Sequence, residues 1–227
     1  MNNFWHHYTT VIPKLLNGVS VTLEITFFAV MIGIVIGMFM ALGKMSRHLW
    51  LKIPANIYIE CLRGTPLFVQ IFLFHYGVSA VIKEIIGAPF SFAVMTTAIV
   101  VCGLNSGAYV AEIFRAGIQS VDKGQMEAGR SLGLTHGQTM WSIIFPQGIK
   151  NCLPTYASEF IVLVKETAVV GYIGMTDLTK AYSTVQSRTM DAMPPLIIIA
   201  VVYFCITKVL SVIFAKMERR LRESDRR

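Results

Sequence analysis

The stretch that decides the fold is ITFFAVMIGIVIGMFMALG, residues Ile25 to Gly43, which contains no Asp, Glu, Lys or Arg. A hydrocarbon core about 30 Å thick is crossed by about 20 helical residues, so this run can span a membrane as a helix. Two further charge-free runs, 64–82 and 85–111, meet the same test. The chain is 54% hydrophobic and only 15% charged, which excludes an ordinary soluble domain.

Two more spans are predicted although they carry charges. One runs from about 153 to 173 and is interrupted by Glu159, Lys165 and Glu166, and the other runs from about 194 to 215. Because a bilayer leaves no water for unpaired backbone groups, each span is expected to be helical. We therefore predict an all-α, polytopic membrane protein with five transmembrane helices.

Lysine and arginine residues are spread unevenly over the segments that join these spans. If the N-terminus lies outside, the inner segments hold Lys44, Arg47, Lys52, Arg115, Lys123, Arg130, Lys150, Lys216, Arg219, Arg220, Arg222, Arg226 and Arg227. The outer segments then hold only Lys14, Lys83, Lys180 and Arg188. The excess of inner cations predicts that the N-terminus is outside and the C-terminus inside. The net charge of +7 is thus read as a sign of membrane orientation and not of a nucleic-acid partner.

The orientation divides the chain into three parts. Residues 1–18 are predicted to form an outer interfacial segment, and residues 19–215 the transmembrane domain. Within that domain, an inner loop at about 119–150 lies on the cytoplasmic side. Residues 216–227 are predicted to form a basic cytoplasmic tail.

The inner loop is predicted to contain two short helices joined by a turn. Asp122 with Gln125 and Thr135 with Gln138 are helix starts of the capping-box type, and Gly133 can end the first helix in the left-handed conformation. The loop carries more apolar side chains than it can bury by itself. We therefore expect a soluble protein to dock there.

The sequence of this loop, EAGRSLGLTHGQTMWSIIFP, resembles the EAA loop of the permease subunits of binding-protein-dependent ABC transporters. The resemblance rests on Glu127, Ala128, Gly129, Gly133 and Pro146, with glycine in place of the usual third alanine. These five residues are accordingly predicted to couple the chain to a cytoplasmic ATPase.

Three other stretches resemble the polar amino-acid branch of that family, namely RGTPLFVQ at 63–70, LNSGAYVAEIFRAGIQSV at 104–121 and EFIVLVKETAVVGYIG at 159–174. The resemblance implies the fold of the MetI-like ABC permeases, in several passes through a bacterial cytoplasmic membrane. It implies three protein partners: an ATP-binding-cassette subunit, a second permease subunit, identical or different, and an extracytoplasmic solute-binding protein. ATP and Mg²⁺ would be bound by the ATPase, so this chain is predicted to be no enzyme and to hold no cofactor or metal.

Polar residues within the spans are the candidates for a substrate site, because burying a charge in a membrane is costly. Glu159 has no cation within four residues in the sequence, and Asn105 and Tyr109 share one helical face. An amino acid needs acceptors for its ammonium group and donors for its carboxylate, and Glu159 with Asn105 can supply the acceptors. The resemblance implies the same two positions, and we extend the prediction to Tyr109 and Gln70.

Other residues have structural interpretations. Glu112 is predicted to pair with Arg115 near the inner boundary. Arg63 is interpreted as an inner-boundary cation at the start of the second span, where it could also act in gating. Gly33 and Gly37 form a GxxxG motif, which could serve packing within one subunit or dimerisation.

The sequence thus predicts a permease subunit that imports polar amino acids, with basic ones among the candidates, across the lipid bilayer by alternating access. The alternative is a self-sufficient secondary amino-acid transporter. Such carriers usually show internal repeats and discontinuous helices, and this sequence shows no duplication.

Overall fold

The computed structural model describes the backbone of residues 2–190 and 193–224 and the side chains of residues 17–187, 190 and 193–220. All regular elements in these ranges are helical, which confirms the all-α class. They are α1 (Asn2–Met45), α2 (Leu49–Arg63), α3 (Leu67–Phe72), the π-helix η1 (Leu73–Val78), α4 (Ser79–Ile86), α5 (Val94–Gln119), α6 (Lys123–Ser131), α7 (His136–Thr139), the π-helix η2 (Met140–Ile144), α8 (Phe145–Glu166), the 3₁₀-helix η3 (Thr167–Ile173), α9 (Leu178–Thr189) and α10 (Met193–Ser224). Met1 and the last three residues of the predicted tail lie outside the described residues.

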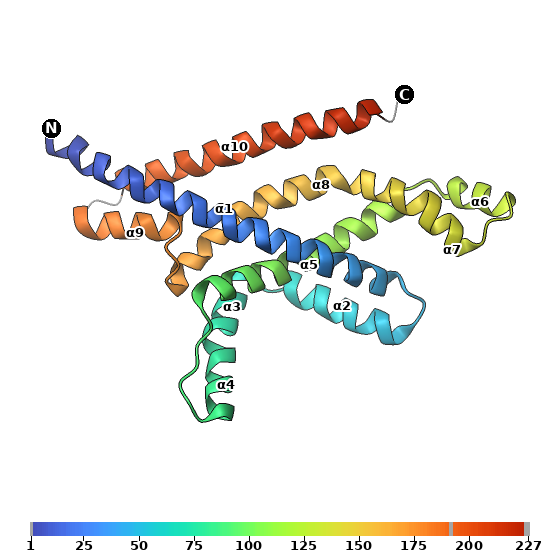
Figure 1. The fold of residues 1–227 in the computed structure, drawn as a ribbon, viewed down its shortest axis with the longest axis horizontal. Coiled ribbons are helices and arrows are strands. Elements are labelled where there is room, and N and C mark those ends of the chain that lie inside the picture. Colours follow the sequence, from blue (N-terminus) through green and yellow to red (C-terminus); the bar gives the residue numbers. More distant parts are fainter. Residues whose placement is uncertain (1, 191–192, 225–227) are drawn as a thin grey trace.

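The centre of the fold is the pair of long helices α1 and α5 (Figure 1). A methyl group on Gly33 would lie 2.8 Å from the hydroxyl of Ser106, and one on Gly37 would lie 2.6 Å from a methyl of Val110. The contacts advance together along both helices, so α1 and α5 run parallel. The GxxxG motif therefore serves close helix packing within this subunit.

Helix α2 runs back along this pair, and the helical path is interrupted at its end. The hydroxyl of Tyr58 donates to the carbonyl of Leu104 over 2.6 Å, halfway along α5. The chain then leaves the helical path at Gly64, and Pro66 caps the start of α3. Because proline lacks an N–H and disfavours helical geometry at the residue before it, Pro66 favours an interruption between α2 and α3.

This break corrects one expectation from the sequence. Arg63 was expected at the inner end of the second span, but α2 carries it along the bundle to the ring of Tyr109, ten residues before α5 ends. The apolar run that begins at Gly64 is therefore only the second part of a discontinuous helix.

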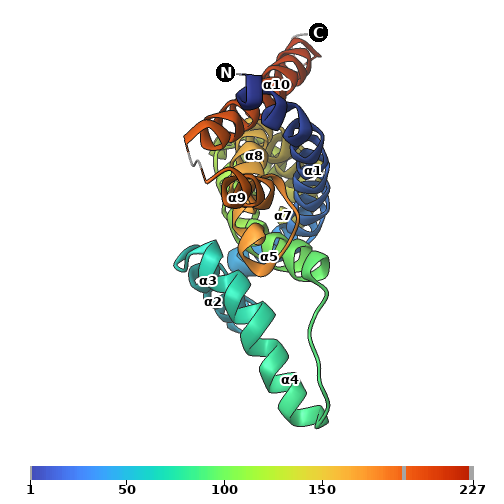
Figure 2. The ribbon, with the colours of Figure 1, turned by 90° about the vertical axis from the view of Figure 1, so that its left-hand side faces the viewer.

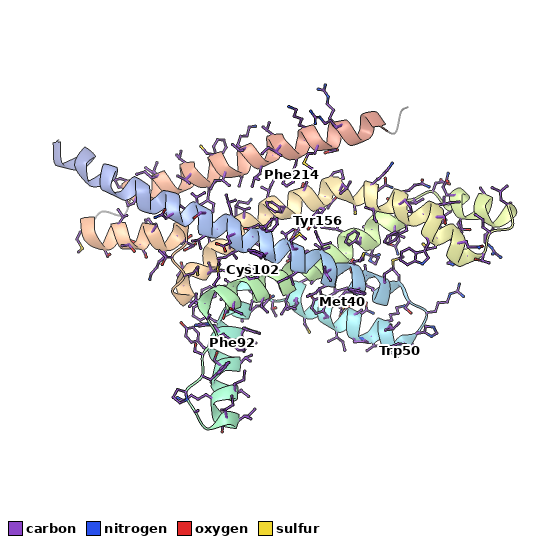
Figure 3. The ribbon with its side chains drawn as sticks, viewed as in Figure 1. Met40, Trp50, Phe92, Cys102, Tyr156 and Phe214 are labelled. Atoms are coloured by element: carbon purple, nitrogen blue, oxygen red, sulfur yellow. The ribbon has the colours of Figure 1, made fainter. Side chains whose placement is uncertain are left out.

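The second part forms an arm that projects from the bundle (Figure 2). It consists of α3, η1 and α4, and the chain returns from its tip through the segment that contains Phe92. Figure 3 shows Phe92 on this arm, well away from Cys102 in the bundle. Several large apolar side chains of the arm are exposed, namely Phe68, Val69, Leu73, Tyr76, Val81 and Ile85.

Four helices of the described chain are long and apolar enough to cross a membrane. They are Asn17–Met45, Leu67–Ile86, Val94–Gln119 and Met193–Arg220. Helix α8, where the sequence predicts a further span, is 22 residues long and packs against α5 and α10, but it carries several charged side chains. Beyond Glu166 the predicted span continues as the 3₁₀-helix η3. The count of five spans and their orientation stay predictions.

Candidate functional site

Gln70 holds the break between α2 and α3 together. Its side-chain nitrogen donates to the carbonyl of Leu62 over 2.7 Å, and to the carbonyl and the hydroxyl of Thr65 over 2.9 Å each. Its side-chain oxygen accepts from the amide nitrogen of Asn105 over 3.0 Å. Only 8% of Gln70 is exposed. The side-chain amide of Gln70 is thus hydrogen-bonded to the backbone of the break and to α5. This residue, which the sequence predicts to bind substrate, instead supports the structure of the break.

Asn105 presents an acceptor that nothing in the described chain uses. Its nitrogen donates to Gln70 and, more weakly at 3.5 Å, to the carbonyl of Leu62. Its oxygen is buried and has no hydrogen-bond partner among the described residues. A buried oxygen without a donor is costly, so a ligand donor at this point would be stabilised. The prediction that Asn105 offers an acceptor agrees with this geometry.

Arg63 and Tyr109 form a second part of the same region. The guanidinium carbon of Arg63 lies 5.3 Å from the centre of the Tyr109 ring, within the range of a cation–π contact. Asn105 contacts the backbone of Leu62, the residue before Arg63, and it precedes Tyr109 by one helical turn. Asn105 and Tyr109 lie one turn apart on α5, as the sequence predicts, and their role in substrate binding stays a prediction, whereas the position of Arg63 beside Tyr109 was not predicted.

Glu159 approaches this region from α8. Its side chain is partly buried, and no hydrogen bond or ion pair joins it to Asn105, Tyr109 or Gln70 within the described residues. The charged groups that act on it electrostatically are Glu166 and Arg63. Arg63 is thus the charged residue of the break that acts on Glu159, and the two side chains form no ion pair among the described residues.

Glu112 belongs to a separate cluster near the C-terminal ends of α1 and α5. Its two carboxylate oxygens accept from Lys44 over 2.6 Å and from Arg115 over 2.7 and 2.9 Å. The predicted pairing with Arg115 is confirmed, and Lys44 at the end of α1 is an additional partner. Both cations are satisfied there, so this cluster ties α1 to α5 and offers nothing to a ligand.

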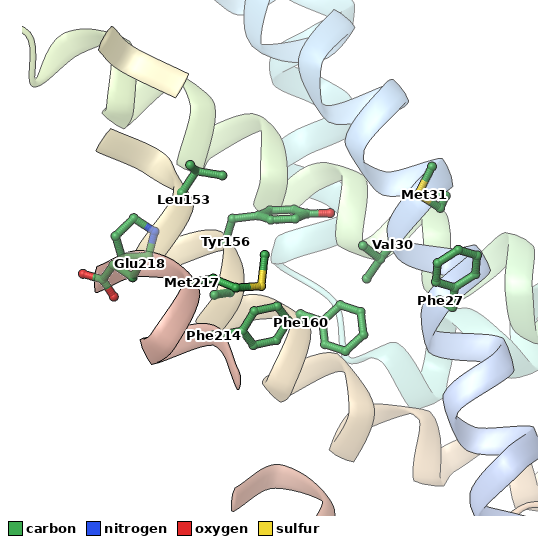
Figure 4. Close-up of a pocket in the computed structure, with 11 residues that line it drawn as sticks. Phe27, Val30, Met31, Leu153, Tyr156, Phe160, Phe214, Met217 and Glu218 are labelled. Atoms are coloured by element: carbon green, nitrogen blue, oxygen red, sulfur yellow. The ribbon is translucent and has the colours of Figure 1, made fainter. Parts of the chain in front are cut away.

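An apolar cavity of about 300 Å³ lies between α1, α8 and α10 (Figure 4). Phe27, Val30, Tyr156 and Phe214 are among its lining residues, and Glu218 is its only charged one. A charged or strongly polar ligand would lose its hydration there without gaining partners. The cavity therefore does not match the polar site at the helix break.

The inner loop has well-formed helix caps. The carboxylate of Asp122 accepts from the backbone nitrogen of Gly124 at the start of α6. Thr135 and Gln138 form the predicted reciprocal capping box at the start of α7, with bonds of 3.3 and 2.8 Å. Between the two helices Gly133 has a φ of 85°, a conformation that favours glycine.

Small residues fix the angle between the two loop helices. Gly129 is buried, and a methyl group there would lie 2.5 Å from a methyl of Thr139 in α7. Glu127 and Ala128 are exposed beside it, and Leu132 is 82% exposed. Pro146 lies at the start of α8, so the loop leads directly into the helix that carries Glu159.

Comparisons with known proteins agree with this architecture. The profile of the family described as "Binding-protein-dependent transport system inner membrane component" matches residues 33–223. The chain is 35% identical to the arginine transport system permease protein ArtQ of Bacillus subtilis, covering 94% of this chain and 95% of the relative. It is 37% identical to the putative glutamine transport system permease protein GlnP of Rickettsia felis, with coverages of 92% and 94%.

Solved structures give the same result. The crystal structure of an amino acid ABC transporter with histidines is 45% identical and superposes with a TM-score of 0.86, covering 94% of this chain and 96% of that chain. An inward-facing MetNI methionine ABC transporter superposes with a TM-score of 0.74 at 19% identity, covering 91% and 95%, which shows a shared fold. The chain therefore belongs to the inner-membrane components of binding-protein-dependent transport systems.

Proposed function

We propose that this chain is the membrane-spanning subunit of an ATP-driven importer for polar amino acids. Relatives that match nearly the whole chain are named for arginine, glutamine and cystine transport. The observation that carries the proposal is the helix break, where α5 brings the Asn105 oxygen, which has no partner among the described residues, and one turn later Tyr109, whose ring the Arg63 guanidinium contacts. Groups of opposite polarity in one place suit a ligand that carries both an ammonium and a carboxylate.

Within this site, Glu159 and Asn105 accept hydrogen bonds from the ammonium group of the substrate. Tyr109 forms one wall of the site, where its ring is in cation–π contact with Arg63. Gln70 supports the site by holding the backbone of the break, and its role is to position Asn105.

The loop of α6 and α7 is the contact for a separate cytoplasmic ATPase, which binds ATP and Mg²⁺. Glu127, Ala128 and Gly129 lie on its first helix, Gly133 makes the turn, and Pro146 joins the loop to α8. Because the caps and the close contact of Gly129 with α7 hold this unit in one shape, it can move as a lever. This role requires the loop to be cytoplasmic, with the N-terminus outside and five spans in the membrane.

The arm from Leu67 to Ile86 is the contact for a second permease subunit, a second copy or a different chain. Its apolar side chains are exposed within the described chain, and an apolar arm of this size needs a cover of protein or lipid. An extracytoplasmic binding protein delivers the substrate from the outer side. ATP-driven closure of the ATPase pair moves the coupling loops, and the two bundles then change the side to which the site opens.

A ligand screen tests the proposal. The chain is purified together with its ATPase in detergent, and the twenty amino acids are tested for binding and for stimulation of ATP hydrolysis in proteoliposomes. A polar or basic amino acid that binds the wild-type complex supports the proposal, and Glu159→Gln is expected to weaken its binding without releasing the ATPase. If none of the amino acids binds or stimulates hydrolysis, the proposed substrate class is wrong. Uptake without ATP would instead indicate a secondary transporter.

A further inference from the structure

The proposed site has acceptors for an ammonium group in Glu159 and Asn105, but neither side chain has a free donor for the carboxylate of an amino acid. An amino-acid carboxylate taken from water into a helical bundle needs a cation or several N–H donors. Gln70, the nearest amide, already donates to Leu62 and Thr65. Asn105 already donates to Gln70. The donor must therefore come from another residue at the break.

We infer that Arg63 is the residue that binds the α-carboxylate of the transported amino acid. This inference rests on the proposed function, and it adds a specificity-determining residue to the site. Arg63 is the last residue of α2, so the helix break itself presents its side chain. Its guanidinium carbon lies 5.3 Å from the centre of the Tyr109 ring, and a cation–π contact of this kind leaves N–H groups of the guanidinium available to other partners. The N–H groups at its edge make no hydrogen bond or ion pair among the described residues.

The cations of the Glu112 cluster provide the comparison. Lys44 and Arg115 both bind Glu112 at hydrogen-bonding distance, as expected for structural cations in an apolar bundle. Arg63 is exposed in the described chain, and it acts electrostatically on the carboxylate of Glu159 in α8 without forming an ion pair with it among the described residues. A separated cation and anion match the two ends of a zwitterion, which can bind between them. A carboxylate can accept two parallel hydrogen bonds from the free edge of a guanidinium.

The inference predicts that Arg63 contributes only to the binding of ligands that carry an α-carboxylate. An amine that lacks only the carboxylate, such as agmatine beside L-arginine or histamine beside L-histidine, can still bind Glu159 and Asn105 but has nothing for Arg63 to hold. Glu159 responds to the ammonium group, which both members of each pair carry. Variants at the two positions should therefore affect the pairs differently.

The experiment measures binding of both ligand pairs to the complex with its ATPase by titration calorimetry. Arg63→Ala is expected to weaken the amino acid about 10- to 100-fold, the range for a lost charge-assisted contact, without weakening the amine. Arg63→Lys keeps the charge but loses the paired geometry, so it should weaken the amino acid less. Lys52→Ala removes an exposed cation from the same helix and should change neither ligand. Co-elution with the ATPase shows that each variant is folded.

The outcomes separate the inference from the proposed function. If Arg63→Ala weakens both members of a pair equally, or leaves the ratio of the two affinities unchanged, Arg63 does not hold the carboxylate. If Arg63→Ala binds the amine more tightly and the amino acid unchanged, Arg63 competes with the ligand's ammonium group for Glu159, and the inference is overturned. If the wild-type complex binds no amino acid at all, the proposed function fails and the inference fails with it. If Arg63→Ala does not fold, the ratio of the amino-acid affinity to the amine affinity is measured with Arg63→Lys. An unchanged ratio in that variant overturns the inference.

Discussion

Replacement of Gln70 by methionine tests whether the helix break is held from within the protein. Methionine has a similar length but no donor or acceptor of this strength, so Gln70→Met removes the bonds to Leu62 and Thr65 and the one from Asn105. Each neutral hydrogen bond contributes roughly 0.5–1.5 kcal/mol net. Four of them, with both bonds to Thr65 counted, amount to roughly 2–6 kcal/mol, and at 8% exposure water cannot easily replace them.

The free energy of unfolding is measured without amino acid present, by titration of the purified complex with a denaturing detergent and detection by tryptophan fluorescence. Gln147→Met is the matched control, because Gln147 makes a single local bond to Ile143 and should cost less than about 1 kcal/mol. The reasoning is refuted if Gln70→Met is as stable as the wild type but binds the amino acid more weakly. Gln70 would then be a ligand residue, as the sequence first suggested, and not the support of the break.

Three further perturbations address the packing of α1 against α5, the buried cap of α9 and the loop of α6 and α7. Gly37→Val should destabilise the bundle by about 1–3 kcal/mol through overpacking, because even a methyl group there would lie 2.6 Å from Val110. Thermal unfolding should show that Val110→Ala partly restores the stability of Gly37→Val. If it restores none, the contact between the two residues is contradicted. Asp177 lies outside the apolar spans and caps α9, and burial raises the pKa of its carboxyl. The folded protein therefore holds this proton more tightly than the unfolded chain does. The free energy of unfolding should fall as the pH rises above about 4, the usual pKa of the carboxyl. Asp177→Asn should remove this dependence in melting curves at about pH 5 and about pH 8, and an unchanged slope would exclude Asp177 as its source. Gly133→Val forces a β-branched residue into a φ of 85° at a cost of order 1–3 kcal/mol, and it should abolish ATP-driven uptake while the subunit stays in the membrane; normal uptake, also with Glu127→Ala, would contradict the lever.

The sequence predicts the helical character of this chain well because burial in lipid leaves few choices. The charge-free run from Ile25 to Gly43 lies within a single helix, and the capping box at Thr135 forms between the expected side chains. These features depend on local composition and on hydrogen bonds a few residues apart. They can therefore be predicted without knowledge of the tertiary fold.

The helix break could not be placed from the sequence. Gly64 and Pro66 indicate an interruption of the helix. Only the packing of α2 along α5 shows that this interruption lies beside Asn105. The role of Gln70 also depends on bonds to Leu62, eight residues away, and to α5. Asn105 and Tyr109 were found because they lie one turn apart on the same helix, whereas Arg63 joins them only through the tertiary fold.

The central claim is that this chain moves amino acids only when a separate ATPase holds its inner loop. The most direct measurement is uptake of labelled arginine, glutamine or histidine into proteoliposomes that contain the chain alone, or the chain with its ATPase, with the binding protein supplied and ATP present or withheld. The account predicts uptake only when both the ATPase and ATP are present. Uptake at the full rate by the chain alone, without nucleotide, would contradict it.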